Sequence, residues 1–248
     1  MTDFTECEYR SLIQLARPKW GFVSFPEHDL FDRCVLWRHD IDISPNRALA
    51  LAKIEREEKV SSTFFILLHS DFYNALEPAT AGVLRSIAAY GHHIGLHFDP
   101  TFYGDRIASR ADLENFLRLE RGILQDVLGL SVSTFSWHNP TVGDWASLED
   151  DTIAGMTNAY GKSIKSRYRY ASDSNGVWRH DRIADVLKDN NNDRLHILTH
   201  PEWWVPSSSL PRDRVIRAVE GRASSTMKRY DDLLKRCGRP NEGNRSDP

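Results

Sequence analysis

The stretch that decides the fold is Val35-Leu36-Trp37-Arg38-His39-Asp40-Ile41-Asp42, an apolar run that leads directly into a group of titratable side chains. The apolar run, which begins at Cys34, predicts a short buried strand. Ser44-Pro45 supplies a favourable N-cap and first-turn residue, so we expect a helix over residues 46–59. Asp40 and Asp42 therefore lie at the C-terminal end of a strand, where α/β folds place their chemistry.

The two carboxylates, Asp40 and Asp42, are one residue apart. They cannot easily both be buried and charged unless they share a proton, face solvent or bind a cation. A divalent metal on one of them would leave the other free as a base. An isolated pair of this kind more often caps a helix or holds a turn, because Asp is favoured there for local reasons.

The composition is that of an ordinary globular protein: 248 residues, 40% hydrophobic, 27% charged and a net charge of −3. The mixed charges give no reason to expect nucleic acid or an anionic membrane as a partner. Apolar runs fall well short of the roughly 20 residues that span a bilayer. The first residues lack the features of a signal peptide, and the three cysteines form neither a disulfide framework nor a CxxC site. We therefore expect a cytoplasmic protein.

Strand and helix patterns alternate along the chain. Strands are expected over residues 34–37, 62–68, 92–98, 132–137, 168–171 and 195–199, and helices over residues 5–17, 46–59, 77–90, 109–128, 181–188 and 211–236. The alternation predicts parallel βαβ units. The lack of a GxGxxG or Walker loop argues against a nucleotide-binding sheet. We expect one domain over residues 1–237 and a disordered tail over residues 238–248.

Titratable residues end one expected strand after another: Asp40 and Asp42, then His69, His97, His138 and His200. In a parallel barrel these strand ends lie on one face, so the set predicts a shared metal or acid–base site. Histidine and aspartate ligands fit Zn²⁺, Fe²⁺, Mn²⁺ or Co²⁺. The metal would polarise a carbonyl and activate a water, a carboxylate would take the proton of that water, and a histidine would protonate the leaving group. The predicted reaction is hydrolysis of an acyl or similar bond.

Three segments carry a resemblance to a known family: Arg38-His39-Asp40-Ile41-Asp42, Gly91-His92-His93-Ile94-Gly95-Leu96-His97 and Leu198-Thr199-His200-Pro201. In this order they resemble the polysaccharide deacetylases, the nodulation-deacetylase type of family 4 carbohydrate esterases, over about residues 34–204. The resemblance implies an α/β fold, a distorted (β/α) barrel with fewer than eight strands. It also implies metal-dependent removal of an N- or O-acyl group from a carbohydrate.

The resemblance also implies roles for individual residues. Asp40 would be the catalytic base and Asp42 a metal ligand. His97 would be a second ligand, and His200 would assist the leaving group. The cofactor would be one divalent ion, with Zn²⁺ as the first expectation and Fe²⁺, Mn²⁺, Co²⁺ or Ni²⁺ as alternatives.

The sequence departs from the family pattern at two places. A second metal histidine usually follows the first by four residues, and Thr101 stands there. The family's Arg-Pro-Pro segment is replaced by Trp137-His138-Asn139-Pro140. We expect His138 to supply the third ligand, with Asp99, His92 and His93 in reserve. The two adjacent histidines begin a strand, at the opposite end of a barrel from such a site, which favours a structural role for both.

Substrate contacts are expected from Arg38, Asp99, Trp137, Asn139, Asp173, Glu202 and Trp203. The two tryptophans could stack on sugar rings or equally pack in the core. Asp173 could orient a catalytic histidine or bind a substrate hydroxyl, although a turn is the commoner use of its segment. Arg38 could hold an anionic group of the substrate or pair with Asp42.

Together these features predict a metal-dependent hydrolase that removes an acetyl or formyl group from an N-acyl amino sugar or sugar nucleotide. A small carbohydrate used to build a surface polysaccharide, such as lipopolysaccharide, is the expected substrate. The alternatives are a metal-dependent hydrolase of another C–N, ester or phosphoester bond, and a non-catalytic carbohydrate-binding descendant. The missing second histidine favours the descendant, and the retention of Asp40, Asp42, His97 and His200 speaks against it. The oligomeric state stays open.

Overall fold

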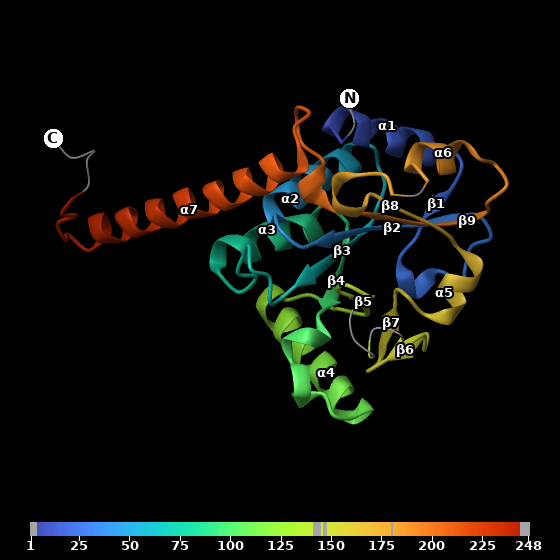
Figure 1. The fold of residues 1–248 in the computed structure, drawn as a ribbon, viewed down its shortest axis with the longest axis horizontal. Helices are drawn as coiled ribbons and strands as arrows, with labels where there is room; N and C mark the ends of the chain where they lie inside the picture. Colours follow the sequence, from blue (N-terminus) through green and yellow to red (C-terminus); the bar gives the residue numbers. More distant parts are fainter. Residues whose placement is uncertain (1–3, 141–144, 146–147, 180, 244–248) are drawn as a thin grey trace.

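One curled sheet organises the protein. The computed structural model describes residues 4–140, 145, 148–179 and 181–243. The strands are β1 (Gly21–Phe22), β2 (Cys34–Ile41), β3 (Thr63–Leu67), β4 (His93–Phe98), β5 (Thr134–Trp137), β6 (Thr152–Ile153), β7 (Met156–Asn158), β8 (Arg169–Ser172) and β9 (Arg194–Thr199). Their order is β6-β7-β5-β4-β3-β2-β9-β8, and β1 pairs with the start of β2 (Figure 1). Pairing is parallel except between β6 and β7.

The predicted fold class, a distorted (β/α) barrel, is confirmed. The barrel is open because β6 and β8, at the two ends of the strand order, are not paired with each other in the described part of the chain. The sheet has nine strands there, whereas fewer than eight were expected. The difference comes from β1, β6 and β7, which are only two or three residues long and which no periodic pattern in the sequence reveals.

Helices cover the outside of the curled sheet (Figure 1). They are α1 (Glu6–Ala16), α2 (Pro45–Glu57), α3 (Pro78–Ala89), α4 (Arg110–Leu128), α5 (Lys162–Arg167), α6 (Ile183–Lys188) and α7 (Pro211–Arg236). Two of the expected caps are present, since the side chains of Ser44 and Ser109 accept hydrogen bonds from the backbone of the first turns of α2 and α4. Gly129 ends α4 in the left-handed conformation, with φ of 68°.

The alternation of side chains along β2 separates packing from chemistry. Val35, Trp37 and Ile41 belong to the apolar clusters beneath the helices. Leu36 belongs to the cluster on the other face, and Arg38 and Asp40 continue along that face towards the end of the strand. All eight residues of β2 are buried, so its polar side chains need partners within the protein.

The register of the strands brings distant residues to one edge. Asp40 pairs with Phe65 on β3, and Leu67 of β3 pairs with His97 on β4. His97 in turn pairs with Ser136 on β5. Because these strands are parallel, the residues that follow them meet at the same end of the barrel.

The C-terminal helix α7 leads away from the body (Figure 1). It covers residues 211–236 as predicted. Residues 244–248 of the expected disordered tail lie outside the described residues, and disorder of the tail stays a prediction. Among the described helices, none combines the length and the apolar character that crossing a membrane requires.

Candidate metal and acid–base site

Three predicted ligands meet at the C-terminal end of the barrel. Asp42 follows β2, His97 lies near the end of β4, and His138 follows β5. Asp42 Oδ1 lies 3.4 Å from His97 Nε2 and 3.7 Å from His138 Nδ1. The two histidine nitrogens are 3.3 Å apart. One donor atom from each residue could thus contact a common ion.

The geometry of these three residues fits a metal ion. A tetrahedral ion with ligand bonds of about 2.0–2.1 Å sets its donor atoms about 3.3 Å apart, close to the three observed distances. Asp42 Oδ1 is buried and accepts no hydrogen bond among the described residues. A buried carboxylate oxygen without a partner is costly, and a cation between Asp42 and the two histidines would remove that cost.

Neighbouring side chains orient the two histidines. His97 Nδ1 lies 2.7 Å from the hydroxyl of Ser136, and the amide of Asn139 lies 2.9 Å from His138 Nε2. Such partners on the far nitrogen hold the ring of a ligand histidine in place. Ser136 was not predicted, although it lies on β5 two residues before His138. Asn139 was predicted to contact substrate, and the structure places its amide against the imidazole of His138.

Asp40 is held by Arg38 through two hydrogen bonds. Arg38 Nε donates to Oδ1 at 3.0 Å and Nη2 donates to Oδ2 at 2.5 Å. Burial acts to raise the pKa of Asp40, but the charges of Arg38 and His97 outweigh it and the pKa lies below its usual value. Asp40 Oδ2 is 3.5 Å from His97 Nε2, so an ionised carboxylate stands beside the ligand set.

Of the two roles expected of Arg38, the pairing with Asp42 was wrong and contact with a substrate stays a prediction. The side chain is fully buried and pairs with Asp40 rather than with Asp42. Its guanidinium lies over the rings of Phe65 and Tyr160, with 4.9 and 4.7 Å between the guanidinium carbon and the ring centroids. Tyr160 comes from the segment after β7, where no sequence motif marks it.

His200 is oriented by Asp173. His200 Nδ1 is 2.6 Å from Asp173 Oδ1, and Asp173 Oδ2 accepts from the backbone of His200 and from the indole of Trp204. Burial acts to lower the pKa of His200, but the hydrogen bond and charge of Asp173 and the charge of Asp42 raise it to about 10. His200 is therefore protonated at neutral pH. Its Nε2 lies 3.9 Å from Asp42 Oδ2, close to the ligand set.

We predict that Asp173→Asn lowers the pKa of His200 from about 10 to the ordinary range of histidine or below. The reason is that the variant loses the negative charge of Asp173, which raises this pKa against the lowering effect of burial. A raised pKa contributes stability below the unfolded-state value of about 6.5, and that contribution is lost as the pH rises through the folded-state value. The variant should thus be less stable by about 3 kcal/mol near pH 6, with a smaller difference above the folded-state pKa. The measurement is an NMR titration of His200 with a chelator present, beside urea unfolding. An unchanged titration would exclude Asp173 as the cause.

Asp173 and Trp137 were also predicted to contact the substrate, and such contact stays a prediction for both. Asp173 is fully buried and acts on His200, so only its orienting role is observed. Trp137 is also fully buried and packs edge-on against Phe98 and Phe135 in the core.

The remaining predicted contacts are Asp99, Glu202 and Trp203. Asp99 caps the short 3₁₀ helix η2 (Pro100–Phe102), and its charge acts on His138. Trp203 lines a groove beside α7. Glu202 is buried, and burial, followed by the charge of Asp42, holds its pKa well above the usual value. Contact of these three residues with a substrate stays a prediction.

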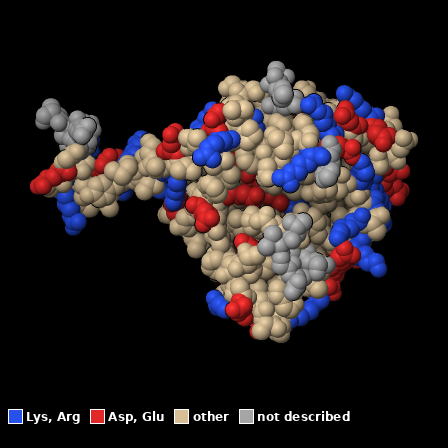
Figure 2. Space-filling model, viewed as in Figure 1, with Lys and Arg blue, Asp and Glu red and all other residues tan. Residues whose placement is uncertain are grey.

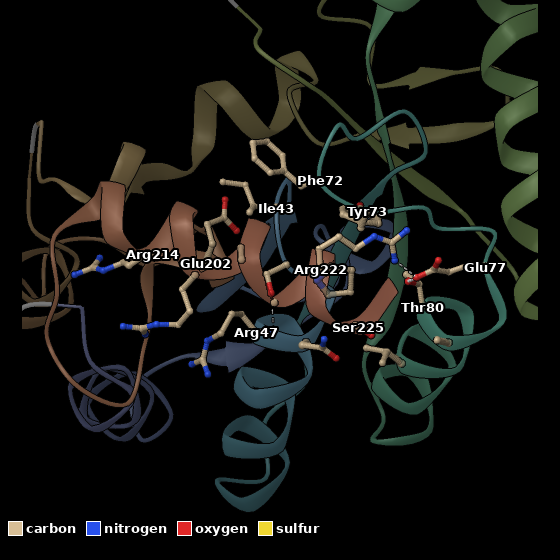
Figure 3. Close-up of a pocket in the computed structure, with 18 of the residues that line it drawn as sticks. Ile43, Arg47, Phe72, Tyr73, Glu77, Thr80, Glu202, Arg214, Arg222 and Ser225 are labelled. Carbon is tan, nitrogen blue, oxygen red and sulfur yellow. Dashed lines mark hydrogen bonds and ion pairs between the residues drawn. The ribbon is translucent and has the colours of Figure 1, made fainter. Parts of the chain in front are cut away.

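A cavity of about 280 Å³ adjoins the site, and Ile43 and Glu202 are in its wall. Figure 3 shows these residues and Phe72 grouped at one end, while Arg222 reaches towards Glu77 at the other. Figure 2, which has the same view as Figure 1, shows acidic side chains in a hollow of the surface near the ends of β2 and β3. The cavity wall thus reaches Ile43, the residue after Asp42, but does not include Asp42, His97 or His138.

Two of the histidines singled out in the sequence lie apart from this site. His69 pairs with Glu120 of α4 at 3.1 Å and stacks on Phe102. His92 is buried before β4, where Nε2 lies 3.0 Å from the carbonyl oxygen of Ala52. The structural role favoured for His92 agrees with this position.

No known family model matches the chain, and no curated protein is similar to it. Solved structures with a similar fold include a chitin deacetylase from Colletotrichum lindemuthianum (17% identity over 76% of this chain and 81% of that chain, TM-score 0.45). They also include the catalytic domain of a peptidoglycan N-acetylglucosamine deacetylase from Eubacterium rectale (12%, 77% and 84%, TM-score 0.47). A third is a CE4 family pseudoenzyme from Bacillus anthracis (11%, 78% and 62%, TM-score 0.44).

Proposed function

We propose that the protein is a metal-dependent carbohydrate deacylase that removes an acetyl or formyl group from an N-acyl amino sugar or sugar nucleotide. The observation that carries the proposal is the opposite ionisation of two groups beside the ligand set. Arg38 keeps Asp40 ionised, and Asp173 keeps His200 protonated. A base and an acid held apart in this way are what hydrolysis of an amide requires.

Each residue has a distinct task in this proposal. Asp42, His97 and His138 would hold a divalent ion, for which Zn²⁺ is the first expectation. A bound ion would act as a Lewis acid that polarises the acyl carbonyl and the attacking water. Asp40 would accept a proton from the attacking water. His200 would donate its Nε2 proton to the leaving nitrogen, which is a poor leaving group until it is protonated.

The proposal is tested by metal content and turnover together. The purified full-length protein, reconstituted with Zn²⁺ or Co²⁺, should bind about one ion per chain and release acetate or formate from N-acylated amino sugars or sugar nucleotides. Elemental analysis and NMR detection of the released acid measure the two quantities. If the metal-loaded protein hydrolyses other amides, esters or phosphoesters but no N-acylated sugar, the proposed sugar substrate is wrong.

A non-catalytic carbohydrate-binding protein is the second candidate. The observation that favours it is Thr101, which occupies the place of the family's second histidine and donates to Asp99 through its amide and hydroxyl. This candidate predicts sugar binding by calorimetry with no metal after reconstitution. Metal binding that depends on His138 would contradict it.

A further inference from the structure

The cavity of about 280 Å³ that reaches Ile43 is rich in arginine. The protein as a whole has a net charge of −3, so an excess of arginine at one place is a local feature. Positive charge gathered in a hollow raises the local concentration of anions. We call this space the arginine cavity. The charged residues in its wall are five arginines and two glutamates, namely Arg47, Arg214, Arg217, Arg222, Arg229, Glu77 and Glu202.

Carboxylates neutralise only part of the positive charge of this wall. Arg47 forms an ion pair with Glu6 at 2.6 Å. Arg222 and Arg229 both pair with the single carboxylate of Glu77, and Figure 3 shows Arg222 reaching across the cavity towards it. These three arginines are thus balanced by two carboxylates, which leaves one positive charge in excess.

The other two arginines, Arg214 and Arg217, form no ion pair with a carboxylate of the described residues. Arg214 is only 5% exposed, and its Nε and Nη1 atoms are buried without a hydrogen bond in that part of the chain. Burial, followed by the charge of Arg217, lowers the pKa of Arg214. Like charges held near each other repel, and an anion bound beside them would offset that cost.

Two helices begin at the arginine cavity. Its wall includes residues 44–47, where α2 starts, and residues 77, 79 and 80, where α3 starts. The N-terminal end of a helix carries a partial positive charge and backbone N–H groups without a partner in the helix. Both features favour an anion, so the two helix ends act in the same direction as the arginines.

Small residues of α7 leave room for a ligand between its arginines. Ala218, Gly221 and Ser225 lie in the wall of the cavity. A Cβ atom built at Gly221 would meet no atom within 4 Å, so the space in front of this residue is open. The arginines of α7 therefore stand around a space rather than against a packed surface.

One end of the arginine cavity borders the segments that carry the catalytic groups. Ile43 follows the ligand Asp42 directly, and Glu202 comes two residues after His200. Figure 3 shows Ile43 and Glu202 next to each other at this end. A substrate with its acyl group at the ligand set would thus extend the rest of the molecule towards the arginines.

We propose that the arginine cavity binds the phosphate or diphosphate group of a phosphorylated amino-sugar substrate, such as a sugar nucleotide. This inference rests on the proposed deacylase function and narrows its substrate to the phosphorylated class. Guanidinium groups match the geometry and charge of phosphate oxygens, and several of them together suit a group with more than one negative charge. A cavity of this size is at the lower end for ligand pockets, so it would hold one part of the substrate.

The first test is a calorimetric titration of the metal-loaded, full-length protein with uridine diphosphate. The wild-type protein should bind it, and Arg217→Gln should weaken binding at least tenfold because a charge-assisted hydrogen bond is lost. Gly221→Leu should weaken it similarly by filling the cavity, while a leucine favours the helix more than a glycine does.

Arg212→Gln is the matched control, because Arg212 is an exposed arginine of α7 outside the wall of the cavity. This variant should bind uridine diphosphate as the wild-type protein does. Binding that neither Arg217→Gln nor Gly221→Leu weakens would place the diphosphate elsewhere, for example on the metal, and would overturn the proposal. A wild-type protein that does not bind uridine diphosphate would overturn it as well.

The second test distinguishes a phosphate group of the substrate from a separate anion. An N-acetylated sugar nucleotide should be hydrolysed with a kcat/KM at least tenfold above that of the same amino sugar without its diphosphate. Arg217→Gln should raise KM for the sugar nucleotide and leave KM for the free sugar unchanged. Equal kcat/KM values for the two substrates, with uridine diphosphate still bound, would show a separate anion and overturn the substrate assignment.

The two tests also separate this inference from the proposed function. Binding of uridine diphosphate that depends on Arg217, without hydrolysis of any acylated sugar, would refute the deacylase function and support the anion site. Hydrolysis of acylated sugars without binding of uridine diphosphate would support the deacylase function and refute the anion site.

Discussion

Replacing Asp40 by asparagine should reduce turnover of the metal-loaded protein by about 10²- to 10⁴-fold while the metal content stays unchanged. An asparagine at this position is not a base, whereas its amide keeps the size of the carboxyl group and one acceptor oxygen for Arg38. The ligand set of Asp42, His97 and His138 does not include Asp40, so the site should still bind the ion. The measurements are initial rates on an N-acylated amino sugar and elemental analysis of the same sample.

The control for this experiment is stability. Asp40→Asn leaves the buried Arg38 with a neutral partner, which costs free energy of folding in addition to any effect on rate. Thermal unfolding of the variant, with metal bound, shows whether enough folded protein is present at the assay temperature. A folded variant with full activity would mean that Asp40 is not the base. A folded variant without metal would place Asp40 among the ligands.

Replacing Asp42 by alanine should remove both the metal and the activity, from about one ion per chain to nearly none. The only anionic member of the ligand set would be lost, and the two histidines alone bind a divalent ion weakly. His138→Ala should have the same effect, because three ligands are the usual minimum of a catalytic site. Elemental analysis after dialysis against excess ion, followed by the rate measurement, gives both quantities.

Asp99→Ala is the matched control for the ligand variants. Asp99 lies close enough for its charge to act on His138, yet it caps the helix η2 and is not in the ligand set. It should keep its metal. Metal retained in His138→Ala and lost in Asp99→Ala would move the third ligand to Asp99.

The pH dependence of metal binding follows from His138. Burial, followed by the charge of His97, lowers the pKa of His138 below 6.5, although Asp42 acts in the opposite sense. Its imidazole therefore stays neutral, and available as a ligand, somewhat below the pH at which a free histidine becomes protonated.

The barrel and the ligand set could be predicted because both follow from local patterns. Alternating strands and helices give parallel βαβ units, and parallel strands end on one face, so residues 42, 97 and 138 had to meet near one another. Strands of two or three residues, such as β1 and β6, leave no periodic pattern and were not predicted. His69 also follows a strand, but its ring turns towards Glu120, a partner on α4 that only packing could select.

What the sequence by itself determined is which residues end the strands and therefore share a face, since hydrophobic periodicity and chain order are local properties. What only the tertiary structure decided is the partner and ionisation of each residue. Arg38 faces Asp40 because side chains two apart on a strand lie on the same face and this one is sealed between Phe65 and Tyr160. Asp173 meets His200 across the β8–β9 pair. Burial and neighbouring charge determine a pKa, and both depend on residues far apart in the sequence.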